Sequence, residues 1–244
     1  MKKGKTIKIA IAVFLIIVLI AIVSVLMLKY EVEGELNMPF NLSKLMVISS
    51  AEGIEKNDTE NLWNFELVQN NDIYIEIEKN DNYKKTEVID KIVLDNFKVN
   101  EEPKKGKIYI YKPTQDNSKI YDYSKESIVE GSLEYKGSQK TDIKNLEISN
   151  QGGRILLRYA IGDLGNFVSD DMDEIIHNGT ILKKANITTE DIKSKISFDL
   201  TIELVSGVKY KACISLEIPV DDVIEEGTTN FELTDLKNIV FKRI

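Results

Sequence analysis

The stretch KISFDLTIELVSGVKYKACISLEI, residues 195–218, gives the clearest indication of the fold of this chain. Apolar and polar side chains alternate on both sides of Val205-Ser206-Gly207. Because successive side chains of a strand point to opposite faces, each half predicts a β-strand with one apolar face. The short loop between the halves predicts that the two strands pair as an antiparallel hairpin.

The length of the loop fixes the register of this hairpin. A three-residue loop sets Ile202 against Tyr210 and Phe198 against Ile214, so the apolar side chains of both strands share one face. It also places Gly207 at the loop position that needs a positive φ. A two-residue turn would shift the register by one residue and mix the two faces.

A second hairpin is predicted closer to the N-terminus. Apolar residues alternate with polar ones through 63–67 and again through 73–77, and the polar segment Gln69-Asn70-Asn71 lies between them. A three-residue loop would put Leu67 opposite Ile73. Each arm would then carry one apolar face.

The rest of the chain is rich in short strand candidates and poor in helices. Residues 188–191, Thr-Thr-Glu-Asp, resemble a capped single turn, and residues 170–176 suggest another. Neither is long enough to be the crossover helix of a parallel sheet. The pattern predicts an all-β ectodomain over residues 44–244, folded as an antiparallel sandwich or a jelly-roll-like domain. The other strand candidates are residues 44–50, 88–99, 107–111, 127–135, 146–149, 155–161 and 231–242.

An apolar run of twenty residues, 9–28, lies near the N-terminus, and Ser24 is its only polar member. As a helix it would be about 30 Å long, which matches the hydrocarbon core of a bilayer. The run is longer than the apolar core of a cleaved signal peptide. Lysines precede it and glutamates follow it, which predicts a cytoplasmic basic segment (residues 1–8), a transmembrane signal anchor, a membrane-proximal segment (residues 29–43) and an extracytoplasmic β domain.

The acidic residues of the chain all lie outside its N-terminal part. The first thirty residues hold five lysines and no acid, so the rest has 27 Lys and Arg against 40 Asp and Glu, a net charge of −13. An acidic domain repels nucleic acid and anionic lipid. We therefore expect a single-pass protein of the cell membrane that meets an envelope protein or a glycan and no nucleic acid.

Residues that could carry catalysis or bind a metal are few. His177 is the only histidine, so a multi-histidine site is excluded, and no G-x-S-x-G motif is present. Asp170, Asp171, Asp173 and Glu174 form the densest acidic cluster and are weak candidates for calcium. The cluster lacks the glycine and the distal glutamate of an EF-hand, so a solvated acidic loop is the other interpretation. We predict no catalytic residue and no cofactor.

Cys213 is the only cysteine, so no intrachain disulfide can form. The register of the hairpin at residues 195–218 places it on the polar face with Lys211 and Ser215. Free cysteine is nevertheless one of the most often buried residue types. We therefore expect a second layer to cover this face and to bury the thiol.

Five tyrosines between residues 109 and 135 are mildly clustered. They could line a binding surface, because tyrosine is enriched at interfaces. They could also fill the half-buried faces of strands, which is the more common role. The five are Tyr109, Tyr111, Tyr121, Tyr123 and Tyr135.

Several stretches of the chain resemble a family of single-pass membrane proteins of clostridia and related low-GC bacteria. The resemblance covers most of the chain and implies a shared anchor and ectodomain, with no known activity or site residue to carry over. The stretches are residues 37–40, 42–44, 103–107, 146–153, 178–182 and 241–243.

Three functions are consistent with these observations. The first is a non-enzymatic, membrane-tethered β domain that binds or assembles with an envelope component. The second is an envelope hydrolase that uses carboxylates or calcium, because many acid pairs could meet in space. The third is an accessory or sensory subunit whose transmembrane helix is itself the contact.

Overall fold

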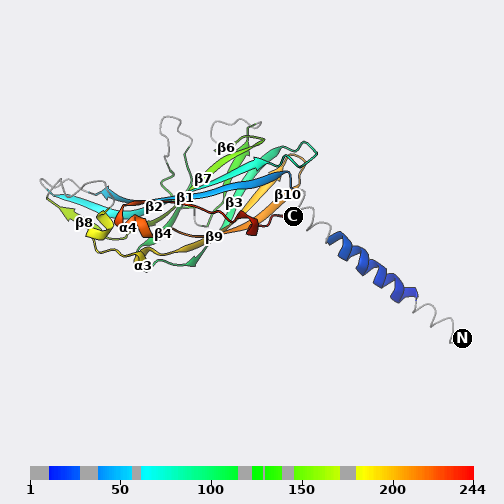
Figure 1. Cartoon of the computed structure of the whole chain (residues 1–244), viewed down its shortest axis with the longest axis horizontal. Coiled ribbons are helices and arrows are strands. Elements are labelled where there is room, and N and C mark those ends of the chain that lie inside the picture. Colours follow the sequence, from blue (N-terminus) through cyan, green and yellow to red (C-terminus); the bar gives the residue numbers. More distant parts are fainter. Residues whose placement is uncertain are drawn as a thin grey trace.

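The chain forms mostly β-structure in two sheets that pack into a sandwich-like body (Figure 1). The prediction of a β-rich, two-layered domain is confirmed. The computed structural model describes residues 11–27, 38–56, 62–114, 123–128, 130–138, 146–170 and 180–244.

The first sheet has the strand order β11-β1-β2-β7-β4, with β8 pairing beside part of β2. All its pairs are antiparallel. Its two longest strands, β1 and β2, form its centre. The strands are β1 (Phe40–Glu55), β2 (Trp63–Lys79), β4 (Lys107–Tyr111), β7 (Gly152–Gly162), β8 (Asn166–Ser169) and β11 (Thr228–Glu232).

The second sheet has the order β12-β10-β9-β3-β5-β6. Its pairs are antiparallel except for β5 and β6, which run parallel. The strands are β3 (Ile89–Glu101), β5 (Leu133–Gly137), β6 (Leu146–Ile148), β9 (Lys195–Leu204), β10 (Lys209–Glu217) and β12 (Lys242–Arg243).

The apolar side chains of both sheets meet in one core. Leu45, Ile73 and Leu157 of the first sheet and Leu94 and Ile202 of the second are fully buried in the same cluster. Burial of this kind stabilises by about 25 cal/mol per Å² of apolar surface removed from water. The apolar residues of the alternating patterns that predicted the strands therefore form the inner faces of the two sheets.

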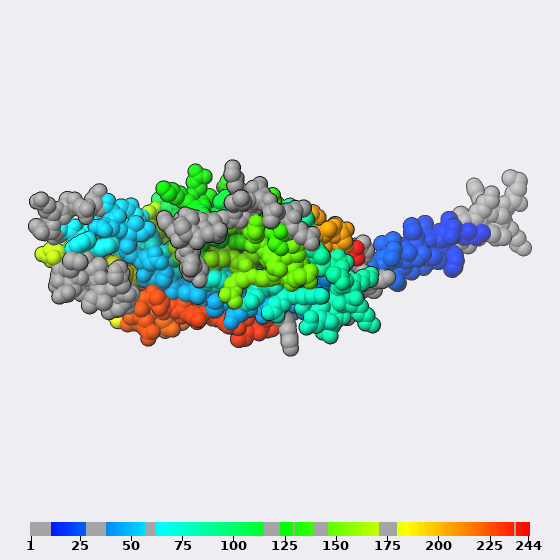
Figure 2. All heavy atoms as spheres, turned by 90° about the horizontal axis from the view of Figure 1, so that it is seen from above, coloured from blue at the N-terminus to red at the C-terminus, as the bar shows by residue number. Residues whose placement is uncertain are grey.

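Short helices connect some of the strands. They are α2 (Ile181–Lys184), α3 (Thr189–Ile192), α4 (Asp221–Glu225) and the 3₁₀ turn η2 (Leu236–Asn238). The segment that carries α4 and β11, orange to red in Figure 2, lies along one long side of the body. The capped turn predicted at residues 188–191 is confirmed as α3.

Acid is expected to weaken the capped turn at α3. Asp191 Oδ2 accepts hydrogen bonds from the Thr188 N–H at 2.9 Å and from its hydroxyl at 2.8 Å, and the backbone bond is the main reason why the pKa of Asp191 lies below its ordinary value. A carboxyl whose pKa is lowered by folding adds stability above its unfolded pKa, and this is lost as the pH falls through the folded pKa. We expect Asp191→Asn to cost about 1 kcal/mol near neutral pH and clearly less near pH 2, measured by urea unfolding. An equal cost at both pH values would contradict this.

The hairpin at residues 195–218 has the predicted register. Ile202 pairs with Tyr210 and Phe198 with Ile214, and Gly207 has a φ of 83°. The Gly207 N–H donates to the Leu204 carbonyl at 2.8 Å, which closes the loop. Local alternation and one glycine were sufficient to predict this part of the fold.

The hairpin predicted between residues 63 and 77 is wrong. Residues 63–79 form the single strand β2, and Ile73 pairs with Val47 of β1 and not with Leu67. The inward-facing alternation continues without a break through Gln69 and Asn71, and both side chains are fully buried. Their amides make hydrogen bonds inside the sandwich, so the polar segment does not have to turn.

The single strand predicted at residues 231–242 is also wrong. This stretch holds the end of β11, the turn η2 and the start of β12, and the two strands belong to different sheets. The Leu233 N–H donates to the Leu45 carbonyl at 2.9 Å, after which the chain leaves the first sheet. Residues 231–242 therefore pass from the first sheet to the second instead of forming a single strand.

Cys213 lies on the outer face of β10, as the register predicts, but the expectation that it is buried is wrong. Its side chain is exposed. Lys211, on the same face, makes an ion pair with Asp199 at 2.8 Å. In the part of the chain that the structure describes, no second layer covers this thiol.

Residues 11–27 form a helix with every side chain exposed, and Figure 1 shows it apart from the β body. Among the described residues, none of the helices has both the length and the apolar character that crossing a bilayer requires. The described helix covers 17 residues of the predicted run 9–28. Ile9, Ala10 and Leu28 lie outside the described residues, as do residues 1–8 and 29–37, so the predicted span is not confirmed.

Candidate binding face

The outer face of the first sheet carries a cluster of aromatic and charged side chains. The register places Asp72 of β2, Arg158 of β7 and Tyr111 of β4 side by side across three strands. The residues one position along each strand point inward to the core, so this row faces away from the second sheet. We call the outward residues Asp72, Tyr74, Tyr109, Tyr111 and Arg158, together with Tyr123 above them, the tyrosine face.

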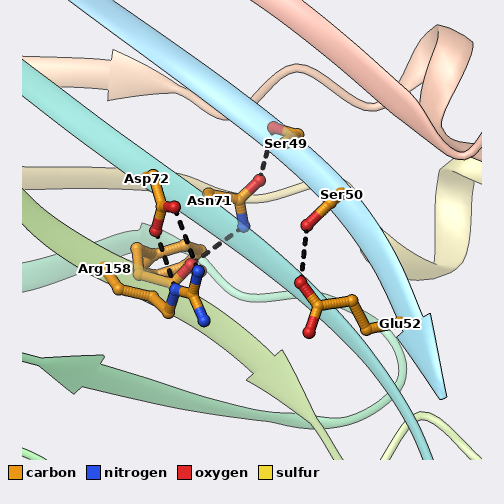
Figure 3. Close-up of polar contacts among 7 residues, drawn as sticks. Ser49, Ser50, Glu52, Asn71, Asp72 and Arg158 are labelled. Atoms are coloured by element: carbon orange, nitrogen blue, oxygen red, sulfur yellow. Dashed lines mark hydrogen bonds and ion pairs between the residues drawn. The ribbon is translucent and has the colours of Figure 1, made fainter. Parts of the chain in front are cut away.

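An ion pair lies at the centre of the tyrosine face. Arg158 Nε donates to Asp72 Oδ1 at 2.7 Å, and Nη2 donates to Oδ2 at 3.0 Å (Figure 3). The two side chains are only 19% and 16% exposed, so solvent screens the pair weakly. Burial works against the charged guanidinium, but the hydrogen bonds with Asp72 outweigh it and raise the pKa of Arg158. The pair holds both side chains in fixed positions.

Tyr123 covers this pair from outside. The Arg158 guanidinium carbon lies 3.9 Å from the centre of the Tyr123 ring, which is a close cation–π contact. Burial, and after it the negative charge of Asp72, raises the pKa of the Tyr123 hydroxyl. Residue 123 is brought there by an isolated bridge to Pro113, just after the end of β4. A proline cannot donate a backbone hydrogen bond to a strand ladder, so the strand ends before it.

Tyr109 and Tyr111 form an aromatic platform at the edge of the face. Their ring centres are 5.9 Å apart and the ring planes differ by 7°. The edge of the Tyr109 ring comes close to Gly162 of β7, where an added Cβ would lie 2.9 Å from Cε2 of the ring. The Tyr109 hydroxyl donates to Asp163 Oδ2 at 3.3 Å. Glycine at position 162 therefore leaves room for the edge of the ring against the neighbouring strand.

The other charges around the platform are also paired. Lys107 Nζ lies 3.0 Å from Asp163 Oδ2, and this hydrogen bond is the main reason why the pKa of Asp163 is below its ordinary value. Arg154 Nη2 lies 3.1 Å from Glu76 Oε2. Each ion pair combines one acid with one base. These pairs are neutral in themselves, although the domain as a whole is acidic.

The inner side of the same strands carries a buried polar cluster. Asn71 Oδ1 accepts from the Ser49 hydroxyl at 2.6 Å and from Gln69 Nε2 at 3.1 Å. Asn71 Nδ2 donates to the Tyr159 carbonyl at 3.0 Å. Figure 3 shows the Asn71 side chain of β2 pointing to Ser49 of β1. The next residue of β1, Ser50, is bonded to Glu52 on the outer side. This cluster ties β1, β2 and β7 together beneath the tyrosine face.

Only one of the acidic residues proposed for calcium, Asp170, lies in the described part of the chain, so that prediction is not tested. Asp170 is exposed just after β8. Asp171, Asp173 and Glu174 lie outside the described residues, as does His177. In the ranges that the structure describes, no group of three or more His, Cys, Asp or Glu side chains could hold a metal ion.

The predicted tyrosine cluster divides into two roles. Tyr109, Tyr111 and Tyr123 lie together on the outer face, which agrees with a binding surface. Tyr135 is buried, and its hydroxyl bonds to the backbone of β7. Tyr121 lies outside the described residues. Arg158 and Asp72 were missed because only the pairing of β2 with β7 shows that they meet.

Comparison of the chain with protein-family models, with curated proteins and with solved structures finds no match. The resemblance to single-pass membrane proteins of clostridia therefore stays a prediction. The contacts of the chain itself are the basis for the function proposed below.

Proposed function

We propose that this chain is a single-pass membrane protein whose β domain lies outside the cytoplasmic membrane and binds an envelope component through the tyrosine face. The proposed anchor is the apolar run at residues 9–28, with its lysines on the cytoplasmic side. The proposed role is binding or assembly and not catalysis.

The arrangement of the tyrosine face is the observation that carries this proposal. Tyrosine and arginine are the side chains most enriched at interface hot spots. Here Arg158 is fixed by Asp72 and Tyr123, and Tyr109 is fixed by Gly162 and its bond to Asp163. Side chains that are ordered before binding lose less conformational entropy when a partner arrives.

The state of the acids on this face favours binding over hydrolysis. Asp72, Asp163 and Glu76 are each engaged by a cation. A two-carboxylate hydrolase needs one acid whose pKa is raised so that it can donate a proton. The pKa of Asp163 is lowered instead, so this carboxyl is a poor proton donor.

The location of the β domain can be tested with the single cysteine of the chain. Cys213 is exposed on β10 and has no competing thiol in the sequence. We expect a membrane-impermeant maleimide to label the full-length protein in intact protoplasts to about the same extent as after lysis. Cys213→Ser serves as the unlabelled control. Labelling that appears only after lysis would place the domain in the cytoplasm and overturn the proposed topology.

The binding role can be tested by photo-crosslinking in living cells. A photo-reactive amino acid at position 111, on the tyrosine face, is expected to give adducts with envelope material. The matched control is the same amino acid at position 83, a tyrosine in the turn after β2. Equal adduct formation at both positions, or none at position 111, would contradict the proposed binding face.

A further inference from the structure

We propose that the outer edge of β11 binds an extended, positively charged segment of another protein, which joins the first sheet as a further strand. This surface is separate from the tyrosine face, because β1 lies between β11 and β2 in the sheet. The inference therefore does not depend on the function proposed above. It defines the partner by two properties, an extended backbone and a basic charge.

Strand β11 forms one edge of the first sheet. The strand order ends with β11, and within the ranges that the structure describes no strand pairs with its outer side. Four of its five residues are exposed, and Thr229 is half-buried. Figure 2 shows the segment that carries α4 and β11, in orange, at the surface along one long side of the body. A partner can therefore reach this edge.

The hydrogen bonds between β11 and β1 show which backbone groups remain for a partner. The Ala51 N–H donates to the Gly227 carbonyl at 2.8 Å, and the Leu233 N–H donates to the Leu45 carbonyl at 2.9 Å. Backbone groups of successive residues in a strand point to opposite edges, so the odd-numbered residues of β11 face β1. The residues whose N–H and C=O groups point to the outer edge are Thr228, Asn230 and Glu232.

The opposite edge of the same sheet is covered, in contrast to β11. The Ile110 N–H of β4 donates to the Ser127 hydroxyl at 3.0 Å, and the Ile110 carbonyl accepts from the Ile128 N–H at 2.7 Å. Edge strands are commonly protected by such a cover, by lysine or proline, or by a bulge. Strand β11, Thr-Thr-Asn-Phe-Glu, has no lysine and no proline, and its register with β1 is regular. It is therefore suited to the addition of a strand.

An added strand would also cover apolar surface on both faces of the sheet. Phe231 is 38% exposed and pairs with the buried Val47, so it lies on the inner face. Ile48 is 37% exposed and pairs with Asn230 on the outer face. Alternate side chains of an extended partner would contact these two residues, which adds apolar burial to the backbone hydrogen bonds.

The charge around the edge favours a basic partner. Residues 221–235 contain six acids and no Lys or Arg. Two of the acids are paired, Glu225 with Lys183 and Glu232 with Lys44. The other four are exposed and make no ion pair with any residue that the structure describes; they are Asp221, Asp222, Glu226 and Asp235. Lysine or arginine side chains on the incoming strand would complement these carboxylates.

The same charges disfavour a second copy of β11 as the occupant. Antiparallel pairing of two β11 strands would bring residues 221–235 of both copies together. Like charges across such an interface repel and weaken pairing. The partner is therefore a different, basic segment.

The test uses the full-length protein in an uncharged detergent and a fluorescent peptide of alternating lysine and valine. We expect saturable binding in fluorescence anisotropy, about tenfold weaker at high than at low salt. A matched peptide of alternating glutamate and valine should not bind. Hydrogen exchange tests the geometry, because the bound peptide should slow exchange of the outward Asn230 N–H. The Thr229 and Phe231 N–H groups, which already face β1, should change little.

Variants of the edge separate backbone pairing from charge. Asn230→Pro removes one outward N–H, keeps the bonds to β1 and should weaken peptide binding at least about tenfold. Asn230→Ala keeps this N–H and should bind as the wild type does. Glu226→Gln with Asp235→Asn should weaken binding about threefold and reduce its salt dependence. Asp81→Asn, in the exposed turn after β2, is the charge-matched control.

The proposal is overturned if the basic peptide does not bind, if the acidic peptide binds equally well, or if the two Asn230 variants bind equally. Charge-dependent binding without slower exchange at Asn230 would show an ionic contact and no added strand. Self-association that is lost in the Asn230→Pro variant would show that a second copy occupies the edge. If circular dichroism shows that the proline variant is unfolded, the exchange measurement and the charge variants decide.

Discussion

Asn71→Ala is expected to lower the free energy of unfolding by about 3 to 5 kcal/mol, because three buried groups each lose a hydrogen bond at once. The Ser49 hydroxyl loses its acceptor, Gln69 Nε2 keeps only the Pro219 carbonyl at 3.4 Å, and the Tyr159 carbonyl loses a donor. The Asn71 side chain is fully buried, so water cannot simply replace it. Urea unfolding of the full-length protein, followed by far-UV circular dichroism, measures the change.

Asn41→Ala is the matched control, because Asn41 is an exposed residue of β1 and its loss should change stability by less than about 0.5 kcal/mol. A Ser49→Ala, Asn71→Ala double-mutant cycle separates the shared hydrogen bond from the rest. We expect the double variant to cost less than the sum of the two single changes. If Asn71→Ala costs no more than Asn41→Ala, the cluster does not hold the three strands together.

Asn71 also shows why part of the fold could not be predicted from the sequence. The triplet Gln69-Asn70-Asn71 has the composition of a turn, and local preferences favour a loop there. The partners of its amides are Ser49, Tyr159 and the Pro219 carbonyl, which are distant in the sequence. Only the assembled sandwich satisfies these groups inside a strand. The β9–β10 hairpin was predictable because its signals, alternation and Gly207, are local.

The candidate site divides in the same way. Alternation along residues 107–111 places Tyr109 and Tyr111 on one face of a strand, so the platform could be predicted from the sequence. The Asp72–Arg158 pair joins residues 86 positions apart, and no spacing in the sequence connects them. The role of Gly162 beside the edge of the Tyr109 ring was missed for the same reason. The pairing of β2, β7 and β4 is what brings these residues into one face.

Tyr135→Phe is the second change for which a large effect is expected, because the Tyr135 hydroxyl takes the place of a missing strand. Strand β4 pairs with β7 only along residues 158–162, so the earlier part of that edge of β7 has no neighbour from β4. The Leu156 N–H donates to the Tyr135 hydroxyl at 3.2 Å, and the hydroxyl donates to the Leu156 carbonyl. One side chain thus satisfies both backbone groups of Leu156 and joins the two sheets.

Removing this hydroxyl leaves an N–H and a carbonyl without their partner at a site where Tyr135 itself is only 4% exposed. We expect Tyr135→Phe to cost about 2 to 3 kcal/mol, although the ring and its packing are kept. The control is Tyr111→Phe, because the Tyr111 ring is half-buried on the tyrosine face. Loss of its hydroxyl should cost less than about 0.5 kcal/mol. Hydrogen exchange adds a local measurement, because the Leu156 amide should exchange faster in the Tyr135 variant only. Equal costs for the two phenylalanine variants, with unchanged exchange at Leu156, would show that the hydroxyl does not hold the edge of β7.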